Sequence, residues 1–265
     1  MTEGIVLMQQ TKSIKDIDVS NQRVLIRVDF NVPLDNEFNI NDDSRIRETI
    51  PTINYCIDHN AKSIILVSHL GRPQGKDSTY SLKHILRRVE RLLGRNVAFA
   101  ESLEALPSIL ALLPQGGVVL LENIRFYEGE ENNDTTLSQN LGKLCDVYVN
   151  DAFGASHRKH ASTYGVAQYA THKVAGLLLK REIDCFSKAL TNPLKPVLLI
   201  VGGSKVSSKL TLLSTILDSV DKILIGGAMS NTFLHAIGYN MQSSLIEPHL
   251  AEDAVKILRT AKAKG

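Results

Sequence analysis

The amino-acid sequence predicts an α/β fold built on parallel sheets. Short runs of apolar and β-branched residues alternate with longer amphipathic stretches along the whole chain. Most of the short runs are solidly apolar, which is typical of parallel strands that helices cover on both faces. A length of 265 residues is enough for one large domain or two small ones.

The expected elements follow one another in a regular order. We expect strands at 24–30, 63–68, 96–100, 118–121, 147–150, 174–178, 197–201 and 222–225. Stretches between them have helical length and spacing, at 47–59, 81–93, 103–113 and 137–145, and further helices are expected at 177–190 and 207–220. The alternation of the two kinds of element is what favours parallel sheets over hairpins.

A domain boundary is expected near residue 190. The helix expected at 177–190 is followed by TNPLKP, whose two prolines disfavour continuation of the helix and stiffen the joint. We therefore expect a first domain at 1–176, a connecting helix and hinge at 177–192, and a second unit at 193–265. Two expected strands bury little apolar surface, so we expect this second unit to be incomplete and the sequence to be truncated.

Charge and cysteine content exclude several classes of function. Thirty basic residues against 28 acidic ones give a net charge of +2, which is too balanced for a general nucleic-acid binder. No apolar run approaches the ~18–20 residues of a membrane helix, and the N-terminus lacks the basic region of a signal peptide. Cys56, Cys145 and Cys185 are scattered, which fits a reducing cytoplasm. We expect a cytoplasmic protein with neither a membrane nor a nucleic acid as partner.

Polar and basic residues lie at the carboxyl ends of four of the expected strands or just after them. They are Asp29 and Asn31, His69 and Arg72, Asn123 and Arg125, and Asn150, Asp151, His157 and Arg158, in strand order. In parallel sheets the carboxyl ends of the strands form the ligand crevice. A set of arginines there suits a small, multiply charged anion, because the guanidinium group binds phosphate or carboxylate through two hydrogen bonds. Each arginine taken alone could equally be a solvated surface charge.

A second candidate site follows the strand at 197–201. The sequence GGSKVSSK at 202–209 joins that strand to an expected helix. Glycines let the backbone approach a phosphate, and a helix N-terminus offers unpaired N–H groups. The segment is not a Walker A loop, which requires GxxxxGK[ST], and its glycines could also serve close packing.

Two further clusters carry a weaker signal. His157 and His160 have a spacing compatible with a metal, but no third ligand lies near them in the sequence, so we expect no zinc site. Glu128, Glu130, Glu131 and Asp134 form an acidic loop. We expect this loop to be solvated rather than to bind calcium, which requires a fuller set of oxygen ligands.

Several blocks of sequence occur together in a characteristic order. They are RVLIRVDFNVPLD at 23–35, SRIRETIPTI at 44–53, VSHLGRP at 67–73, LLENIRF at 120–126, VNDAFGASHRKHAS at 149–162, IVGGSKVSSK at 200–209 and ILIGGAMSNTF at 223–233. In these blocks the chain resembles the phosphoglycerate kinase family. The resemblance implies two Rossmann-like, three-layer domains with parallel sheets, the second one incomplete. It also implies the glycolytic and gluconeogenic transfer of a phosphoryl group between 1,3-bisphosphoglycerate and ADP, giving 3-phosphoglycerate and ATP, with Mg²⁺.

The resemblance assigns roles to individual residues. The substrate site that it implies consists of Asp29, Phe30, Asn31, Arg45, His69, Leu70, Gly71, Arg72, Arg125 and Arg158. The nucleotide site consists of Gly202, Gly203, Lys205, Lys209, Gly226 and Gly227. Arg45 and Lys205 would be the catalytic residues, because they would face the phosphoryl group that is transferred. No residue of this chain is assigned as a metal ligand.

The chain departs from the family in what its sequence lacks. Family members carry a GGGD(T/S) phosphate loop, an acid that positions the metal, an acid for the ribose and a WNGPMG segment, and none of these occurs among the 265 residues. The resemblance therefore implies a complete domain for 3-phosphoglycerate and half a site for ATP or ADP. We expect a monomer that is inactive as a chain of this length; the alternative to the kinase is a chain that only binds 3-phosphoglycerate.

Overall fold

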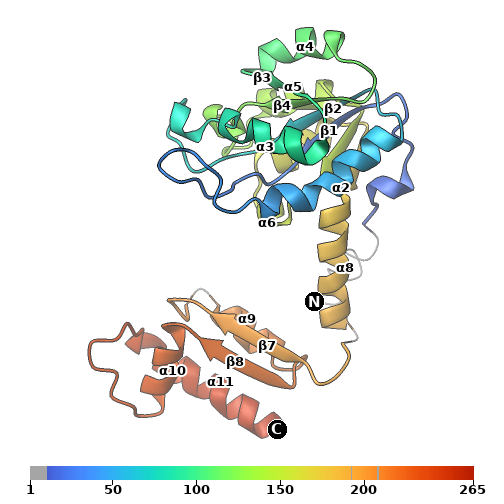
Figure 1. The fold of residues 1–265 in the computed structure, drawn as a ribbon. Helices are drawn as coiled ribbons and strands as arrows, with labels where there is room; N and C mark the ends of the chain where they lie inside the picture. The colour runs from blue at the N-terminus through green and yellow to red at the C-terminus, as the bar shows by residue number, and fades with distance from the viewer. Residues whose placement is uncertain (1–10, 192, 208) are drawn as a thin grey trace. The chain divides into compact units, whose positions relative to one another are not determined.

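A six-stranded parallel sheet forms the centre of the first part of the chain (Figure 1). Its strands are β1 Arg23–Arg27, β2 Ser63–Val67, β3 Val97–Ala100, β4 Gly117–Leu121, β5 Val147–Asn150 and β6 His172–Ala175, in the spatial order β3-β4-β2-β1-β5-β6. A strand lies at each expected place, but β1 ends before the expected Phe30, and β6 lies at 172–175 rather than 174–178 because α8 begins at Leu177. The Phe30 N–H donates to Ser68 Oγ at 2.8 Å instead of pairing with a neighbouring strand.

Helices cover both faces of this sheet, which confirms the three-layer architecture. One face is covered by α2 Ser44–Asp58 and α3 Lys83–Leu93 (Figure 1). The other is covered by α4 Leu106–Leu112, α5 Thr135–Lys143 and α7 Val166–Tyr169. Successive strand residues point to opposite faces. Val24 and Ile26 therefore pack with the residues of α2 and α3, whereas Leu25 packs with those of α4 and α5. This double burial is why the strands read as solidly apolar.

Short helices complete the first part of the chain. They are η1 Ile14–Asp16, η2 Ser78–Tyr80, η3 Leu103–Ala105, η4 Ile124–Phe126, α6 Phe153–Ser156 and the π-helical turn η5 Ala161–Gly165. Two of them, η4 and α6, directly follow β4 and β5, so they lie at the carboxyl edge of the sheet. This edge is where the sequence places its polar and basic residues.

The computed structural model describes residues 11–191, 193–207 and 209–265, and it divides the chain into two compact units, Met1–Cys185 and Phe186–Gly265. The division falls inside α8 Leu177–Thr191. The presence of α8 confirms the helix expected at 177–190. Among the described residues, none of the helices combines the length and apolar character that crossing a membrane requires.

The second unit contains a two-stranded parallel sheet. Its elements are β7 Leu198–Gly202, α9 Leu210–Ile216, β8 Lys222–Gly226, α10 Met229–Ala236, η6 Pro248–Leu250 and α11 Ala251–Lys264. α9 is shorter than the helix expected at 207–220, and Ser208 lies outside the described residues. Val201, Leu213 and Phe233 are buried in this unit, but Leu198, Ile200 and Leu224 are each more than half exposed. The sheet therefore buries one face only.

Candidate functional site

The loops that follow β1, β2 and β4 meet at Gly71. Asn31 Oδ1, in the loop after β1, accepts a hydrogen bond of 2.8 Å from the Gly71 N–H. Arg125, in η4 after β4, donates from Nη1 to the Gly71 carbonyl oxygen at 2.5 Å. Since β4, β2 and β1 are neighbours in the sheet, their carboxyl ends bring these residues to one place.

Gly71 adopts a backbone conformation that requires glycine. Its φ is +61°, and a Cβ atom at this position would lie 2.2 Å from the ring of Tyr80. This turn buries Leu70, whose carbonyl oxygen accepts a hydrogen bond of 2.8 Å from Asn123 Nδ2. It leaves Arg72 exposed. Phe30, which the resemblance also assigns to the site, is fully buried.

Four guanidinium groups lie near enough to His69 to affect its pKa. This histidine is 5% exposed, and its Nδ1 lies 3.1 Å from Arg27 Nη2. Burial, together with the charges of Arg27, Arg125, Arg158 and Arg45, lowers the pKa of His69 to about 2. Three of these arginines are among the predicted site residues. The site therefore combines a neutral imidazole with a high local positive charge, which favours an anionic ligand.

Arg45 and Asp29 form an ion pair beside this basic cluster. Arg45 is the second residue of α2, and its Nη1 lies 2.6 Å from Asp29 Oδ2 in the loop after β1. The pair lines a hollow of about 570 Å³ together with Phe153 and Gly154, which belong to α6. A small phosphorylated acid is of a size that such a hollow can hold.

Asp151 lines the same hollow at the end of β5. Its side chain is completely buried, and Oδ1 accepts a hydrogen bond of 3.0 Å from the Leu179 N–H in the first turn of α8. Among the described residues Oδ2 has no hydrogen-bond partner. Burial raises the pKa of Asp151 to about 6. Asp151 therefore connects the lining of this hollow to α8.

The acidic loop after β4 is only partly solvated. Glu128, Glu131 and Asp134 are exposed, as expected, but Glu130 is 1% exposed, so the prediction that the loop is solvated is wrong for this residue. Glu130 accepts hydrogen bonds from the N–H and the hydroxyl of Ser162 at 2.9 and 2.6 Å. A buried carboxylate requires such donors because the loss of water is otherwise too costly.

Sequence reasoning also missed Arg27. This residue lies in β1, is 2% exposed and donates from Nε to Ser162 Oγ at 2.9 Å. The signal that could have found it is its position inside the apolar run VLIRV, because a charged side chain in a buried strand needs a partner of opposite charge.

The second unit brings the predicted glycines together. Gly202 at the end of β7 pairs with Gly226 at the end of β8. Gly227 has a φ of +69°, and a Cβ atom there would lie 2.7 Å from the Gly203 carbonyl oxygen. Gly227 therefore lets its backbone approach that of Gly203 closely, whereas a Cβ atom at Gly226 would meet no atom within 4 Å.

The two predicted lysines flank this glycine contact. Lys205 is exposed, and Lys209 precedes α9 with its Cε beside Gly203. The carboxylate of Glu247 accepts hydrogen bonds from the Ser207 N–H at 3.0 Å and the Ser207 hydroxyl at 2.7 Å. The Glu247 carboxylate thus binds the two Ser207 donors, which lie in the loop where the sequence predicts a phosphate.

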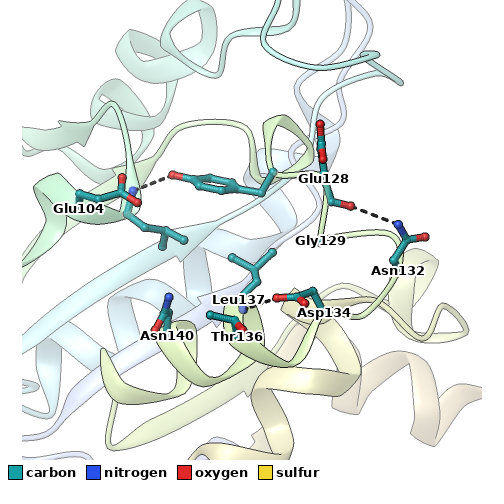
Figure 2. A pocket seen from close by; sticks show the side chains of 10 residues that line it. Glu104, Glu128, Gly129, Asn132, Asp134, Thr136, Leu137 and Asn140 are labelled. Carbon is teal, nitrogen blue, oxygen red and sulfur yellow. Dashed lines mark hydrogen bonds between the residues drawn. The ribbon is translucent and has the colours of Figure 1, made fainter.

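A separate hollow of about 530 Å³ lies between the acidic loop and α5, and Figure 2 shows its lining. Glu104, Glu128 and Asp134 contribute carboxylates, and Asp134 Oδ1 accepts a hydrogen bond of 2.8 Å from the Leu137 N–H at the start of α5. None of the predicted site residues lines this hollow. Its carboxylates disfavour an anionic ligand.

The described residues contain no cluster of side chains that would hold a metal ion by protein ligands alone. Within these parts of the chain, no group of three or more His, Cys, Asp or Glu side chains is arranged to hold a metal ion. His160 Nδ1 instead lies 3.6 Å from Glu130 Oε1. Mg²⁺ commonly binds through nucleotide phosphates and one or two carboxylates, so it does not require such a group of three.

Comparisons with known proteins find the same family along the chain. The family model described as "PGK: Phosphoglycerate kinase" matches residues 14–265. Phosphoglycerate kinase of Wolinella succinogenes is 71% identical over 265 residues, which cover 100% of this chain and 66% of that protein. The enzyme of Helicobacter hepaticus is 66% identical over 261 residues, covering 98% of this chain and 65% of the relative.

Solved structures agree with the sequence relatives. The phosphoglycerate kinase structure from Coxiella burnetii superposes with a TM-score of 0.83 at 39% identity, covering 96% of this chain and 64% of that one. The structure from Pyrococcus horikoshii gives a TM-score of 0.81 at 27% identity, with 94% and 65% covered. The chain therefore spans about two thirds of the length of the proteins that it matches.

Proposed function

The chain belongs to the phosphoglycerate kinase family, and we propose that its first unit binds 3-phosphoglycerate for reversible phosphoryl transfer between 1,3-bisphosphoglycerate and ADP. The observation that carries this proposal is the cluster of Arg27, Arg45, Arg125 and Arg158 around the neutral His69. A ligand with a phosphate and a carboxylate matches that charge.

The remaining residues of the rim have roles in the proposal. Asp29 and Asn31 hydrogen-bond the hydroxyl group and the carboxyl end of the substrate, and Arg125, Arg158 and Arg72 hold its phosphate. Asn31 and Arg125 are already fixed to Gly71 by hydrogen bonds. The cost of ordering them is therefore met by the fold rather than by ligand binding.

The proposed chemistry needs no general base. In the direction that consumes ATP the nucleophile is the substrate carboxylate, which is ionised at pH 7 because carboxyl groups titrate near pH ~4. Arg45 and Lys205 would stabilise the charge on the oxygens of the phosphoryl group during transfer. His69, which is neutral, would donate a hydrogen bond from Nε2 without adding charge.

The nucleotide site is proposed at Gly202, Gly203, Lys205, Lys209, Gly226 and Gly227. A nucleotide phosphate would take the Ser207 donors that Glu247 now holds. Mg²⁺ would arrive on the nucleotide, since phosphate oxygens are its preferred ligands, and it would supply charge neutralisation. The observation that supports this proposal is the close approach of Gly227 to Gly203, beside which Lys209 lies.

We also propose the cytoplasm as the compartment and a monomer as the state of the protein. The tobacco relative, 48% identical, is named a cytosolic phosphoglycerate kinase. Cys56 and Cys145 are buried free thiols, and burial raises the pKa of each to about 12, which keeps them in the unreactive protonated form. Neither a nucleic acid nor a membrane has a role in the proposal.

Titration calorimetry with 3-phosphoglycerate tests the substrate proposal. We expect one molecule bound per chain, with affinity lost in Arg125→Ala. Arg87→Ala is the matched control, because Arg87 is an exposed arginine on α3 outside the rim. Equal affinity in Arg125→Ala and Arg87→Ala would contradict the assigned site.

A coupled assay that follows ATP consumption tests catalysis separately. We propose that a polypeptide of only these 265 residues binds 3-phosphoglycerate but transfers no phosphoryl group at a measurable rate. In the family that the chain resembles, a GGGD(T/S) segment forms a second phosphate loop and a further acid positions the metal. The 265 residues contain neither of these sequences. Loss of a single preorganised group costs about 10²–10³ in rate, so turnover within tenfold of an intact relative would overturn this part of the proposal.

A further inference from the structure

Glu130 is the buried member of the acidic loop, and it holds the segment that leads away from Arg158. Its side chain accepts both donors of Ser162, the N–H at 2.9 Å and the hydroxyl at 2.6 Å. Its own carbonyl oxygen accepts the Ala161 N–H at 2.9 Å. Backbone and side chain of one residue thus fix the start of η5.

The hydroxyl of Ser162 joins Glu130 to Arg27. It donates to Glu130 Oε1 and accepts from Arg27 Nε at 2.9 Å. Arg27 Nη2 lies 3.1 Å from His69 Nδ1. A guanidinium group has no acceptor, so His69 Nδ1 must accept this bond and its proton must lie on Nε2. The chain of contacts therefore runs from a buried acid to the ring orientation of His69.

Burial holds the residues of this chain of contacts to their present partners. Glu130, Ser162 and Arg27 are each at most 2% exposed, so none of them can exchange its partner for water. Burial acts to raise the pKa of Glu130, but the hydrogen bond from His160, the charge of Arg27 and the bonds from Ser162 bring that pKa below its usual value. The carboxylate is therefore ionised at neutral pH and balances the buried guanidinium charge.

The same segment sets the backbone of Arg158. Thr163, the third residue of η5, donates from Oγ1 to the Arg158 carbonyl oxygen at 2.7 Å. The His160 N–H donates to Thr163 Oγ1 at 3.2 Å. Because Glu130 fixes η5, it also fixes the turn that follows Arg158.

We propose that Glu130 is a positioning residue of the anion site, which orients His69 through Ser162 and Arg27 and orients Arg158 through η5. This inference rests on the proposed binding of 3-phosphoglycerate for its ligand. Glu130 touches no ligand in it. If Glu130 acted only through its negative charge, it would oppose anion binding, and its removal would tighten binding. If Glu130 positions the site, its removal weakens binding.

The test compares Glu130→Gln with Glu128→Gln in the 265-residue chain. The glutamine has one oxygen where the carboxylate has two, so one donor of Ser162 loses its acceptor. We expect the dissociation constant for 3-phosphoglycerate to rise roughly tenfold in Glu130→Gln, which is the effect of losing a charge-assisted hydrogen bond. Glu128→Gln changes an exposed acid of the same loop and should leave the constant within about twofold.

Ser162→Ala is the second variant, because it removes only the hydroxyl bridge. It should weaken binding as Glu130→Gln does, and the double variant should be less than additive because both changes break the same bridge. If Glu130→Gln does not fold, Ser162→Ala carries the test. Tighter or unchanged binding of 3-phosphoglycerate by the folded variants would overturn the proposal.

The ¹⁵N signals of the His69 ring give a readout without ligand. In the wild type they should show a neutral ring with the proton on Nε2. We expect them to shift in Glu130→Gln and Ser162→Ala but not in Glu128→Gln, whereas unchanged signals in both would overturn the inference. If the wild type fails to bind 3-phosphoglycerate, the proposed function fails, and the His69 signals still decide whether Glu130 orients this ring.

Discussion

Arg45 Nη1 lies 2.6 Å from Asp29 Oδ2, so the guanidinium group that we expect to meet the transferred phosphoryl group is paired with a carboxylate of the substrate rim. The two side chains come from different elements, the loop after β1 and the first turn of α2. Arg45 is about half exposed, whereas Asp29 is mostly buried. The pair therefore fixes Arg45 at the rim but leaves its outer face open to a ligand.

Arg45→Ala should reduce turnover more than it raises the Michaelis constant for 3-phosphoglycerate. The positive charge of Arg45 would stabilise the negative charge that develops on the phosphoryl group during transfer. Arg45 would therefore stabilise the transition state more than the bound substrate. The measurement needs steady-state kinetics in this chain joined to the remaining part of the Wolinella succinogenes relative. Arg47→Ala, on the same helix, is the control. A raised Michaelis constant with intact turnover would assign Arg45 to ground-state binding instead.

Arg158→Ala should weaken binding of 3-phosphoglycerate by roughly 1.5–3 kcal/mol, the contribution of a charge-assisted hydrogen bond. Arg158 is close enough to His69 and Arg125 to affect the pKa of both, so it belongs to the same charge cluster. Titration calorimetry on the 265-residue chain measures the loss, with Lys159→Ala, the exposed neighbour, as control. Equal affinities for wild type and Arg158→Ala would remove this residue from the site.

Asp151 should make the protein less stable as the pH rises from about 4 to about 6. Its pKa is raised from 3.8 to about 6 by burial, so the folded state binds more protons than the unfolded state in this window. Below the pKa of Asp151 in the unfolded state, the buried charge does not lower the free energy of unfolding. Above the pKa in the folded state, it lowers this free energy by the full amount. Asp151→Asn, which cannot ionise, should gain roughly 1–3 kcal/mol relative to the wild type between pH 4 and pH 7.

Urea unfolding of both proteins at several pH values measures this difference. Asp146→Asn is a useful contrast, because the hydrogen bond from Arg23 lowers the pKa of that carboxyl group, so its contribution should be lost as the pH falls. A difference between Asp151→Asn and the wild type that does not vary with pH would mean that Asp151 is ionised in the folded protein throughout this range.

Hydrogen exchange should be faster in β7 and β8 than in β1 and β2. Leu198, Ile200 and Leu224 leave one face of the two-stranded sheet exposed, whereas β1 and β2 are central strands buried on both faces. Amide protection follows the free energy of local opening, which falls where few apolar contacts are buried. Mass spectrometry of peptides from 197–226 and 23–67 compares the two. Equal protection would show that the second unit is stabilised by contacts that the exposed face does not suggest.

The sequence by itself determined the parallel α/β architecture and which polar residues lie at the carboxyl edge of the sheet. Apolar runs such as Ser63–Val67 are local patterns, and a polar residue that follows each run must lie at the carboxyl edge. Hence Asp29, Asn31, His69 and Arg125 could be named before the fold was known. The ends of the elements were less certain: β1 ends at Arg27, and the Phe30 N–H donates to the side chain of Ser68, which lies far along the chain.

Only the tertiary structure decided which charges are buried together. Glu130 follows Glu128 in a polar loop and has the pattern of a solvated acid, yet it is buried. Ser162 in η5 donates to Glu130, and Arg27 in β1 donates to Ser162. Such a network joins residues more than a hundred positions apart, and its stability depends on the exclusion of water by all of them at once. Periodicity and composition report local structure and average burial, so they cannot reveal a polar contact that exists only when distant segments have packed.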